Sequence, residues 1–217
     1  MQGWFFAYIR HKNTLENIYK REAAMKPVRN VLYLVLLAFL LAACGPANSV
    51  RLLPPPFMEG AVLPGPKAPR VTVVAFEDKR PDQTVIGSRR DNSAFVTSDS
   101  VPLWISKALA DELARNGLQV SYADSVTQAR AGDPDYLVTG AVDQVWLKEN
   151  SATDLATTMR VEYVLANRQG RVYSETLNAS QSRTVMPLGS TAENLMLDTL
   201  RELIKPMSQK IVQTIES

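Results

Sequence analysis

The side chains able to do chemistry are few in this chain, and they lie in two places. The chain has one cysteine, Cys44, and one histidine, His11, which lies far upstream of it. The carboxylates of Glu77, Asp78 and Asp82 follow a run of β-branched residues. A lone cysteine followed by no histidine provides neither a disulfide nor a Cys/His zinc site. A carboxylate cluster can bind a cation or act in acid–base catalysis.

The carboxylate cluster is predicted to be a solvated loop. Lys79 and Arg80 lie among the acids, and Pro81 is typical of a surface turn. The sequence contains no glycine-rich phosphate loop and no S-x-x-K motif. We therefore expect no enzymatic activity, no metal and no cofactor. A hydrolase that relies on the carboxylates alone is the remaining catalytic alternative.

The charge distribution argues against nucleic-acid binding. The whole chain has a formal charge of +2. Six basic and two acidic residues precede Cys44, whereas eighteen basic and twenty acidic residues follow it, a net of −2. A nucleic-acid-binding domain would carry a basic excess of its own. We therefore expect no nucleic-acid partner.

Residues 25–43 have the composition of a signal peptide. Lys26 and Arg29 form a short basic region, which is followed by the apolar run of residues 31–43. A helix of about 13 residues, at about 1.5 Å each, is too short for a hydrocarbon core of about 30 Å. A short transmembrane anchor is the alternative interpretation.

Residues 1–24 do not fit in front of a signal peptide, which should begin near the N-terminus. They contain several aromatic residues and a mixed-charge stretch. We expect Met25 to be the initiating residue and residues 1–24 to be an upstream extension created by a start codon placed too early. The alternative is a genuine amphipathic extension.

The residues Leu41, Ala42, Ala43 and Cys44 resemble the bacterial lipobox. The resemblance implies that the lipoprotein signal peptidase recognises the first three and that Cys44 becomes the new N-terminus. It also implies a covalent diacylglycerol and an N-acyl chain on Cys44, which is enough lipid for stable anchoring. Because Gly45 stands where an Asp would favour inner-membrane retention, the implied location is the outer membrane, facing the periplasm. A small buried core cysteine is the alternative.

The chain after Cys44 divides into a tether and a domain. Seven of the thirteen prolines lie in residues 45–69, and such a segment favours extended conformations. We expect residues 44–69 to be the lipidated cysteine with a Pro-rich tether, and residues 70–217 to be a single α+β periplasmic domain.

Hydrophobic periodicity predicts the architecture of that domain. Residues 157–166 alternate between apolar and polar, which predicts a strand that pairs with residues 171–182. An apolar stripe after Ser100 predicts a helix that ends at Gly117. A second helix is expected after Ser190. The prediction is a two-layer α+β sandwich, with a mixed or antiparallel sheet of about four to five strands and two amphipathic helices packed on one face.

Details of two elements are also predictable. The alternation along residues 135–148 loses phase after Val142, which indicates a bulge near Asp143 and Gln144. Ser190 to Glu193 match a capping box, and Pro206 is expected to kink or split the helix that follows.

A cluster of arginines around the long loop is a candidate contact surface. Arg80, Arg89 and Arg90, with Phe95 nearby, could contact a protein or an anionic glycan. Solvated loop charges are the alternative.

Several segments resemble the YajG-type bacterial lipoproteins. They are the leader, the strand at residues 71–76 with its charged loop, the segment at residues 85–87 and the helix ending at Gly117. The segment at residues 135–142 more loosely resembles the TolB N-terminal domain and the curli-secretion lipoproteins. These resemblances imply an envelope location and a binding module rather than an enzyme.

We therefore expect a lipid-anchored, non-enzymatic binding or assembly module. Its partners would be membrane lipid through Cys44 and an envelope protein or cell-wall component. The alternative is an auxiliary lipoprotein of an ABC-type lipid or solute transport system, which a hydrophobic groove beside a helix would favour.

Overall fold

The computed structural model describes residues 48–56, 62–184 and 189–217. Ala47–Ser217 forms one compact unit. The predictions that concern Met25, the residues Leu41 to Ala43 and Cys44 lie outside the described residues. Within the described ranges, no helix is long and apolar enough to cross a membrane.

The described part of the chain forms one mixed eight-stranded sheet and three helices. The strands are β1 (Arg70–Val74), β2 (Glu77–Asp78), β3 (Val85–Ser88), β4 (Ala94–Val96), β5 (Gln119–Ala123), β6 (Tyr136–Ser151), β7 (Asp154–Asn167) and β8 (Gly170–Thr184). The helices are α2 (Val101–Arg115), α3 (Val126–Ala131) and α4 (Gly189–Glu216).

Strand β6 organises the sheet because it has partners on both sides. On one side it pairs antiparallel with β7, and β7 pairs antiparallel with β8. On the other side β1, β2 and β3 follow one another along β6, each parallel to it. Strand β5 pairs with β1, and β4 pairs with β3. The register between β6 and β7 shifts between Val142 and Gln144, which confirms the predicted bulge.

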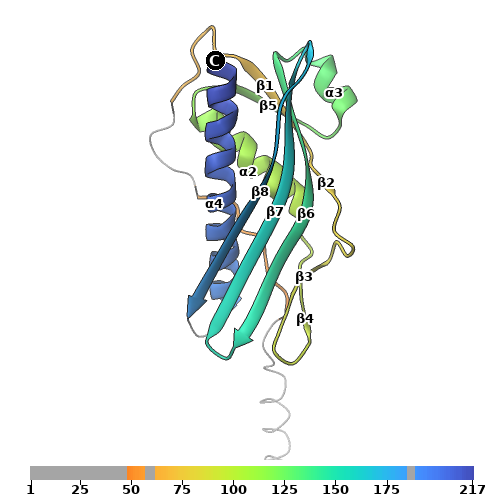
Figure 1. Cartoon of the computed structure of the whole chain (residues 1–217), viewed down its shortest axis with the longest axis vertical. Coiled ribbons are helices and arrows are strands. Elements are labelled where there is room, and N and C mark those ends of the chain that lie inside the picture. Colours follow the sequence, from red (N-terminus) through yellow and green to blue (C-terminus); the bar gives the residue numbers. More distant parts are fainter. Residues whose placement is uncertain (1–47, 57–61, 185–188) are drawn as a thin grey trace, which may run out of the picture. The chain divides into compact units, whose positions relative to one another are not determined.

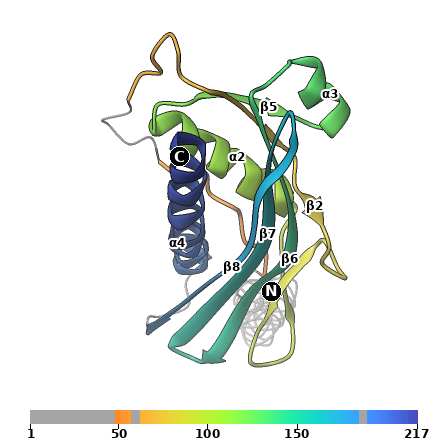
Figure 2. The ribbon, with the colours of Figure 1, turned by 45° about the horizontal axis from the view of Figure 1, so that its top comes forward.

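The core lies between one face of this sheet and helices α2 and α4. The alternating residues Met159, Val161, Tyr163 and Leu165 of β7 are all buried in it, as the sequence pattern predicted. Figures 1 and 2 show α2 and α4 side by side along the same face of the sheet. The expected two-layer arrangement of these two helices is therefore confirmed.

Helix α2 begins and ends where the sequence predicted. The Ser100 hydroxyl accepts a hydrogen bond from the Leu103 backbone N–H, and Pro102 occupies the first turn. After the C-cap at Asn116, Gly117 has a φ of 86°, a left-handed conformation that favours glycine.

The sheet has eight strands, so the expectation of four to five strands was too low. The additional strands are short, and their side-chain pattern is weak. Glu77–Asp78 illustrate this, because a polar loop was expected there and the backbone instead pairs with Ala141–Val142 of β6. Backbone pairing of this kind depends on where β6 lies and not on the local residues.

Two further details differ from the expectation. Helix α3 lies on the opposite face of the sheet, where Ala129 packs against Val74 and Ala123. Helix α4 begins at Gly189, so the predicted cap residue Ser190 lies inside its first turn. The helix continues through Pro206, so the expected split is wrong, whereas the alternative of a kink stays a prediction. Burial of one apolar face along the sheet stabilises this helix beyond its local propensity.

The segment expected to be a free tether packs partly against the domain. Residues 48–56, here named the N-terminal strap, place Val50 and Leu52 in the core with exposed fractions of 2% and 8%. The Trp104 indole N–H donates to the Leu53 carbonyl at 2.8 Å. The folded domain therefore begins well upstream of Arg70.

Candidate functional site

Arg80, the first of the predicted contact residues, is buried in its own loop. Its guanidinium donates to both carboxylate oxygens of Asp78, with Nε–Oδ1 and Nη2–Oδ2 distances of 2.8 and 2.7 Å. It also donates to the carbonyls of Gln83 at 2.9 Å and Val85 at 3.4 Å. This bidentate geometry fixes the loop between β2 and β3. The side chain is therefore used inside the domain.

Arg89 and Phe95 also lie inside the domain. The Arg89 guanidinium lies 5.1 Å from the centre of the Phe95 ring, which is a cation–π contact. Its Nε lies 3.3 Å from Glu149 Oε2, and its Nη1 donates to Asn48 Oδ1 at 3.0 Å. Of the four predicted contact residues only Arg90 is exposed.

The carboxylates of Asp78 and Asp82 have different hydrogen-bond partners and do not form one cluster. Asp78 pairs with Arg80, whereas Asp82 accepts hydrogen bonds from the Thr84 hydroxyl and backbone N–H, both at 2.8 Å. The Thr84 hydroxyl, followed by its backbone N–H, lowers the pKa of Asp82 below 3.8. Across the described residues, no group of His, Cys, Asp or Glu is arranged to hold a metal ion.

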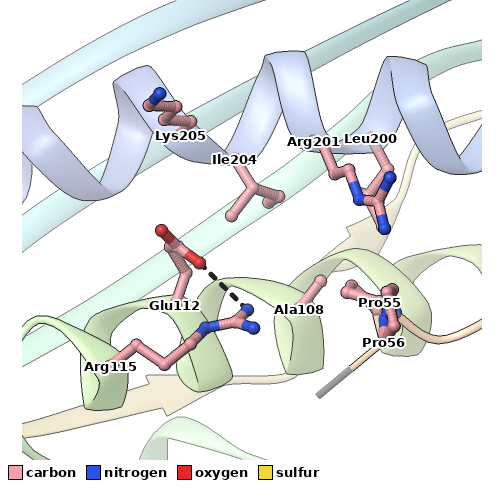
Figure 3. Close-up of a pocket in the computed structure, with 9 residues that line it drawn as sticks. All are labelled: Pro55, Pro56, Ala108, Glu112, Arg115, Leu200, Arg201, Ile204 and Lys205. Atoms are coloured by element: carbon pink, nitrogen blue, oxygen red, sulfur yellow. Dashed lines mark ion pairs between the residues drawn. The ribbon is translucent and has the colours of Figure 1, made fainter. Parts of the chain in front are cut away.

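A groove between α2 and α4 is the best candidate for a binding site. Its volume is about 400 Å³, which lies within the range of small-molecule pockets. Ala108 lies on the α2 side, and Leu200 and Ile204 lie on the α4 side (Figure 3). Pro55 and Pro56 of the N-terminal strap close one part of the groove. The base of the groove is therefore apolar and built from three separate segments.

Charged side chains surround this apolar base. Glu112 and Arg115 of α2 form an ion pair with a 2.9 Å Oε2–Nη2 distance, and Figure 3 shows this pair along the α2 side of the groove. Arg201 of α4 pairs with Asp198 at 3.1 Å, and Lys205 lies one turn further along the helix. Arg115 and Arg201 are thus already paired, whereas Lys205 has no ion-pair partner among the described residues, and this cation favours a ligand with an anionic group.

The groove could not have been located from the sequence. Its walls come from residues 55–56, from the middle of α2 and from the middle of α4, which are far apart in the chain. One signal was present, because Pro54 to Pro56 form a rigid run that cannot join a sheet. Only the packing of α2 against α4 shows what that run touches.

Comparisons with known proteins extend only to the fold. No protein-family model matches the sequence, and no curated protein matches it. A solved Xanthomonas campestris protein of family DUF330 is similar in structure, with a TM-score of 0.54, 10% identity, and 77% of this chain and 95% of that chain covered. This similarity shows that the chain has the same α+β fold.

Two further solved structures are more distant. A lipoprotein from Neisseria meningitidis has a TM-score of 0.37 and 15% identity, with 67% of this chain and 99% of that chain covered. PelC from Paraburkholderia phytofirmans, described as a dodecamer, has a TM-score of 0.41 and 19% identity, with 67% and 95% covered. None of these three structures is described as a YajG-type protein, so that resemblance stays a prediction.

Proposed function

We propose that this protein is a lipid-anchored, non-enzymatic binding module of the bacterial envelope that uses the α2–α4 groove as its ligand site. The anchor is Cys44, supported by the lipobox-like residues before it. The outer membrane, with the domain in the periplasm, is supported by Gly45 after the cysteine.

The observation that carries this proposal is the chemistry of the groove. An apolar base formed by Ala108, Leu200 and Ile204 suits a hydrocarbon chain, whose transfer from water is favourable by about 25 cal/mol per Å². Lys205 at its edge, which has no ion-pair partner among the described residues, suits an anionic head group. The ligand is therefore an amphipathic anion such as a fatty acid or a phospholipid.

The groove also favours a second, more specific role as an auxiliary lipoprotein of an ABC-type transport system for lipids. Such a role requires a site that holds one hydrocarbon chain outside the membrane, and a groove of about 400 Å³ is large enough for part of an acyl chain. In either role the partner protein would be another component of the envelope.

Binding of a fluorescent fatty acid to the Ala47–Ser217 unit tests the groove. We expect saturable binding that Ile204→Trp weakens at least tenfold, because the larger side chain fills the apolar base. The matched control is Val172→Trp, which adds the same ring at an exposed position of β8. Absence of saturable binding, or equal affinity of the Ile204 variant and the unchanged domain, would remove the groove as the ligand site.

The charge requirement has its own test. Lys205→Glu should weaken the fatty acid several-fold and leave an uncharged long-chain alcohol unaffected. Lys148→Glu, on an exposed residue of β6 outside the groove, is the control. Crosslinking in intact cells separates the two roles, because capture of a permease or an ATPase would support the transport role and repeated capture of other envelope proteins would not.

A further inference from the structure

We propose that the domain stands upright on the membrane, on the end formed by the β3–β4 loop and the β6–β7 turn. This proposal rests on the lipidation of Cys44 that is part of the proposed function. We name the residues of this end, 48, 89–92 and 151–154, the anchor end. The residues of the opposite end, 133–135 and 167–170, are named the distal end.

The start of the N-terminal strap is fixed to the anchor end. The Asn48 carbonyl accepts a hydrogen bond from the Val96 backbone N–H at 2.9 Å, and its side chain accepts one from Arg89 at 3.0 Å. The Val50 backbone N–H donates to the Val96 carbonyl at 2.8 Å. The strap therefore cannot move away from the domain without breaking three hydrogen bonds and exposing the buried Val50 side chain.

The chain between the lipid and this fixed point is short. Asn48 follows Cys44 by four positions in the sequence. Four residues span at most about 14 Å, at about 3.3–3.6 Å per residue. The expected long tether is therefore replaced by a short one, which holds the anchor end close to the lipid head groups.

The sheet register separates the two ends by the length of a long strand. Gly87 of β3 lies beside Leu147, near the end of β6 that leads into the β6–β7 turn. Tyr136, at the start of β6, lies beside Asn167 and the β7–β8 turn. The 14 residues of β7 span about 45 Å at about 3.3 Å per residue. Figure 1 shows the β3–β4 loop and the β6–β7 turn at one end and the β7–β8 turn at the other.

Surface charge favours an upright domain over one that lies flat on the outer face of the sheet. On the outer face of the sheet Lys79 is paired with Glu162 at 3.5 Å, and Arg160 with Asp143 at 3.8 Å. These two pairs are already balanced, whereas Lys148 of the same face is exposed and has no ion-pair partner among the described residues. Lys148 lies beside Ala156, close to the β6–β7 turn at the anchor end, so it favours contact of that end with anionic lipid. At the anchor end Arg90 is exposed and has no ion-pair partner among the described residues, so it is available to a lipid phosphate.

An upright domain has a functional consequence. The α2–α4 groove then opens to the side, above the head groups, and the distal end faces the periplasm. A ligand would reach the groove from the aqueous side or from a partner protein, and not directly from the bilayer.

Single fluorescent labels in the turns before and after β7 test the orientation of the domain on the membrane in the full lipoprotein. Because lipidation would use the thiol of Cys44, a newly introduced cysteine would be the only free thiol in the mature chain. Ala152→Cys in the β6–β7 turn and Gln169→Cys in the β7–β8 turn are matched exposed positions at the two ends of β7. Each is labelled with a fluorophore and reconstituted in phosphatidylethanolamine–phosphatidylglycerol vesicles that carry a nitroxide on the lipid head group.

We expect the label at residue 152 to be quenched at least threefold more than the label at residue 169. Insertion of twenty Gly/Ser residues after Pro46 should largely remove this difference, because the tether no longer holds the anchor end at the surface. Equal quenching of the two labels would show that the domain lies flat, and stronger quenching at residue 169 would show that it is inverted. Either result overturns the proposal.

Mass spectrometry of the mature chain shows whether Cys44 carries acyl chains, and this result distinguishes failure of the upright orientation from failure of the proposed lipid anchor. Acyl chains on Cys44 together with equal quenching would overturn the upright orientation only. A chain without acyl groups on Cys44 would overturn the lipid anchor and the orientation together. Loss of fatty-acid binding in the groove variants bears on neither result.

Discussion

Replacement of Arg80 by alanine separates a structural role of this side chain from a role in partner binding. Arg80 and Asp78 have side-chain exposed fractions of only 4% and 10%. Removal of the guanidinium leaves the Asp78 carboxylate buried without its partner, which typically costs about 3–5 kcal/mol. The carbonyl of Gln83 also loses the hydrogen bond that it accepts from Arg80. We expect Arg80→Ala to lower the free energy of unfolding by about 3 kcal/mol.

Lys79 provides a control at the neighbouring position. Its ion pair with Glu162 is 3.5 Å long, and the two side chains have exposed fractions of 45% and 46%. Exposed pairs of this kind contribute less than about 1 kcal/mol. Lys79→Ala should therefore leave the stability nearly unchanged, although it removes the same charge.

Urea unfolding followed by tryptophan fluorescence measures the difference. With a urea dependence of about 2 kcal/mol per M, the expected loss shifts the midpoint by about 1.5 M. The double variant Asp78→Asn/Arg80→Met should recover part of this loss, because neither charge is then left buried alone. If Arg80→Ala and Lys79→Ala shift the midpoint equally, the buried pair does not stabilise the loop and the reasoning is refuted.

Three further predictions concern the sheet, the strap and the pH dependence. Gly87→Ala should destabilise the domain by about 3 kcal/mol in thermal unfolding, because a Cβ there would lie 1.9 Å from the Leu147 carbonyl oxygen; an unchanged melting temperature would contradict the β3–β6 register. Leu52→Ala should cost about 2 kcal/mol in urea unfolding, whereas a free tether would give no change. The Asp82 carboxyl should titrate below pH 3.8 by NMR, because the Thr84 hydroxyl and backbone N–H lower its pKa. Because the pKa of Asp82 is lower in the folded state than in the unfolded state, the ionised carboxylate stabilises the domain at pH values above the unfolded pKa. This stabilisation is lost as the pH falls through the folded pKa. Thr84→Val should raise the folded-state pKa of Asp82 and so reduce the loss.

The elements with strong local patterns were predictable. The alternation from Met159 to Leu165 predicts that one side of β7 is buried in the core, and this prediction does not depend on the strands that pair with β7. Gly117 ends α2 because its left-handed backbone favours a residue without a Cβ. The bulge after Val142 was visible because it shifts the alternation by one residue.

Elements that depend on distant partners were not predictable. Glu77–Asp78 form a strand because β6 offers backbone groups beside them, and nothing in a polar dipeptide indicates this. The same holds for Arg80, since a charged loop residue usually lies in solvent and this one is enclosed by the loop that it binds. Val50 and Leu52 lie in a proline-rich stretch whose composition suggested a tether, and only their burial reveals the contact.

The covalent chemistry that is open to this protein follows from its residue types alone. Because Cys44 is the only cysteine and no histidine follows it, catalysis that needs either residue is excluded from the chain after that point. Its composition and alternation also determined the α+β class. The surfaces depend on the folded chain, because the groove joins α2, α4 and the N-terminal strap, and because the strap packs against the domain although its composition suggested a tether. Residue types and spacing act over a few positions, whereas grooves and tether lengths depend on contacts between segments far apart in the chain.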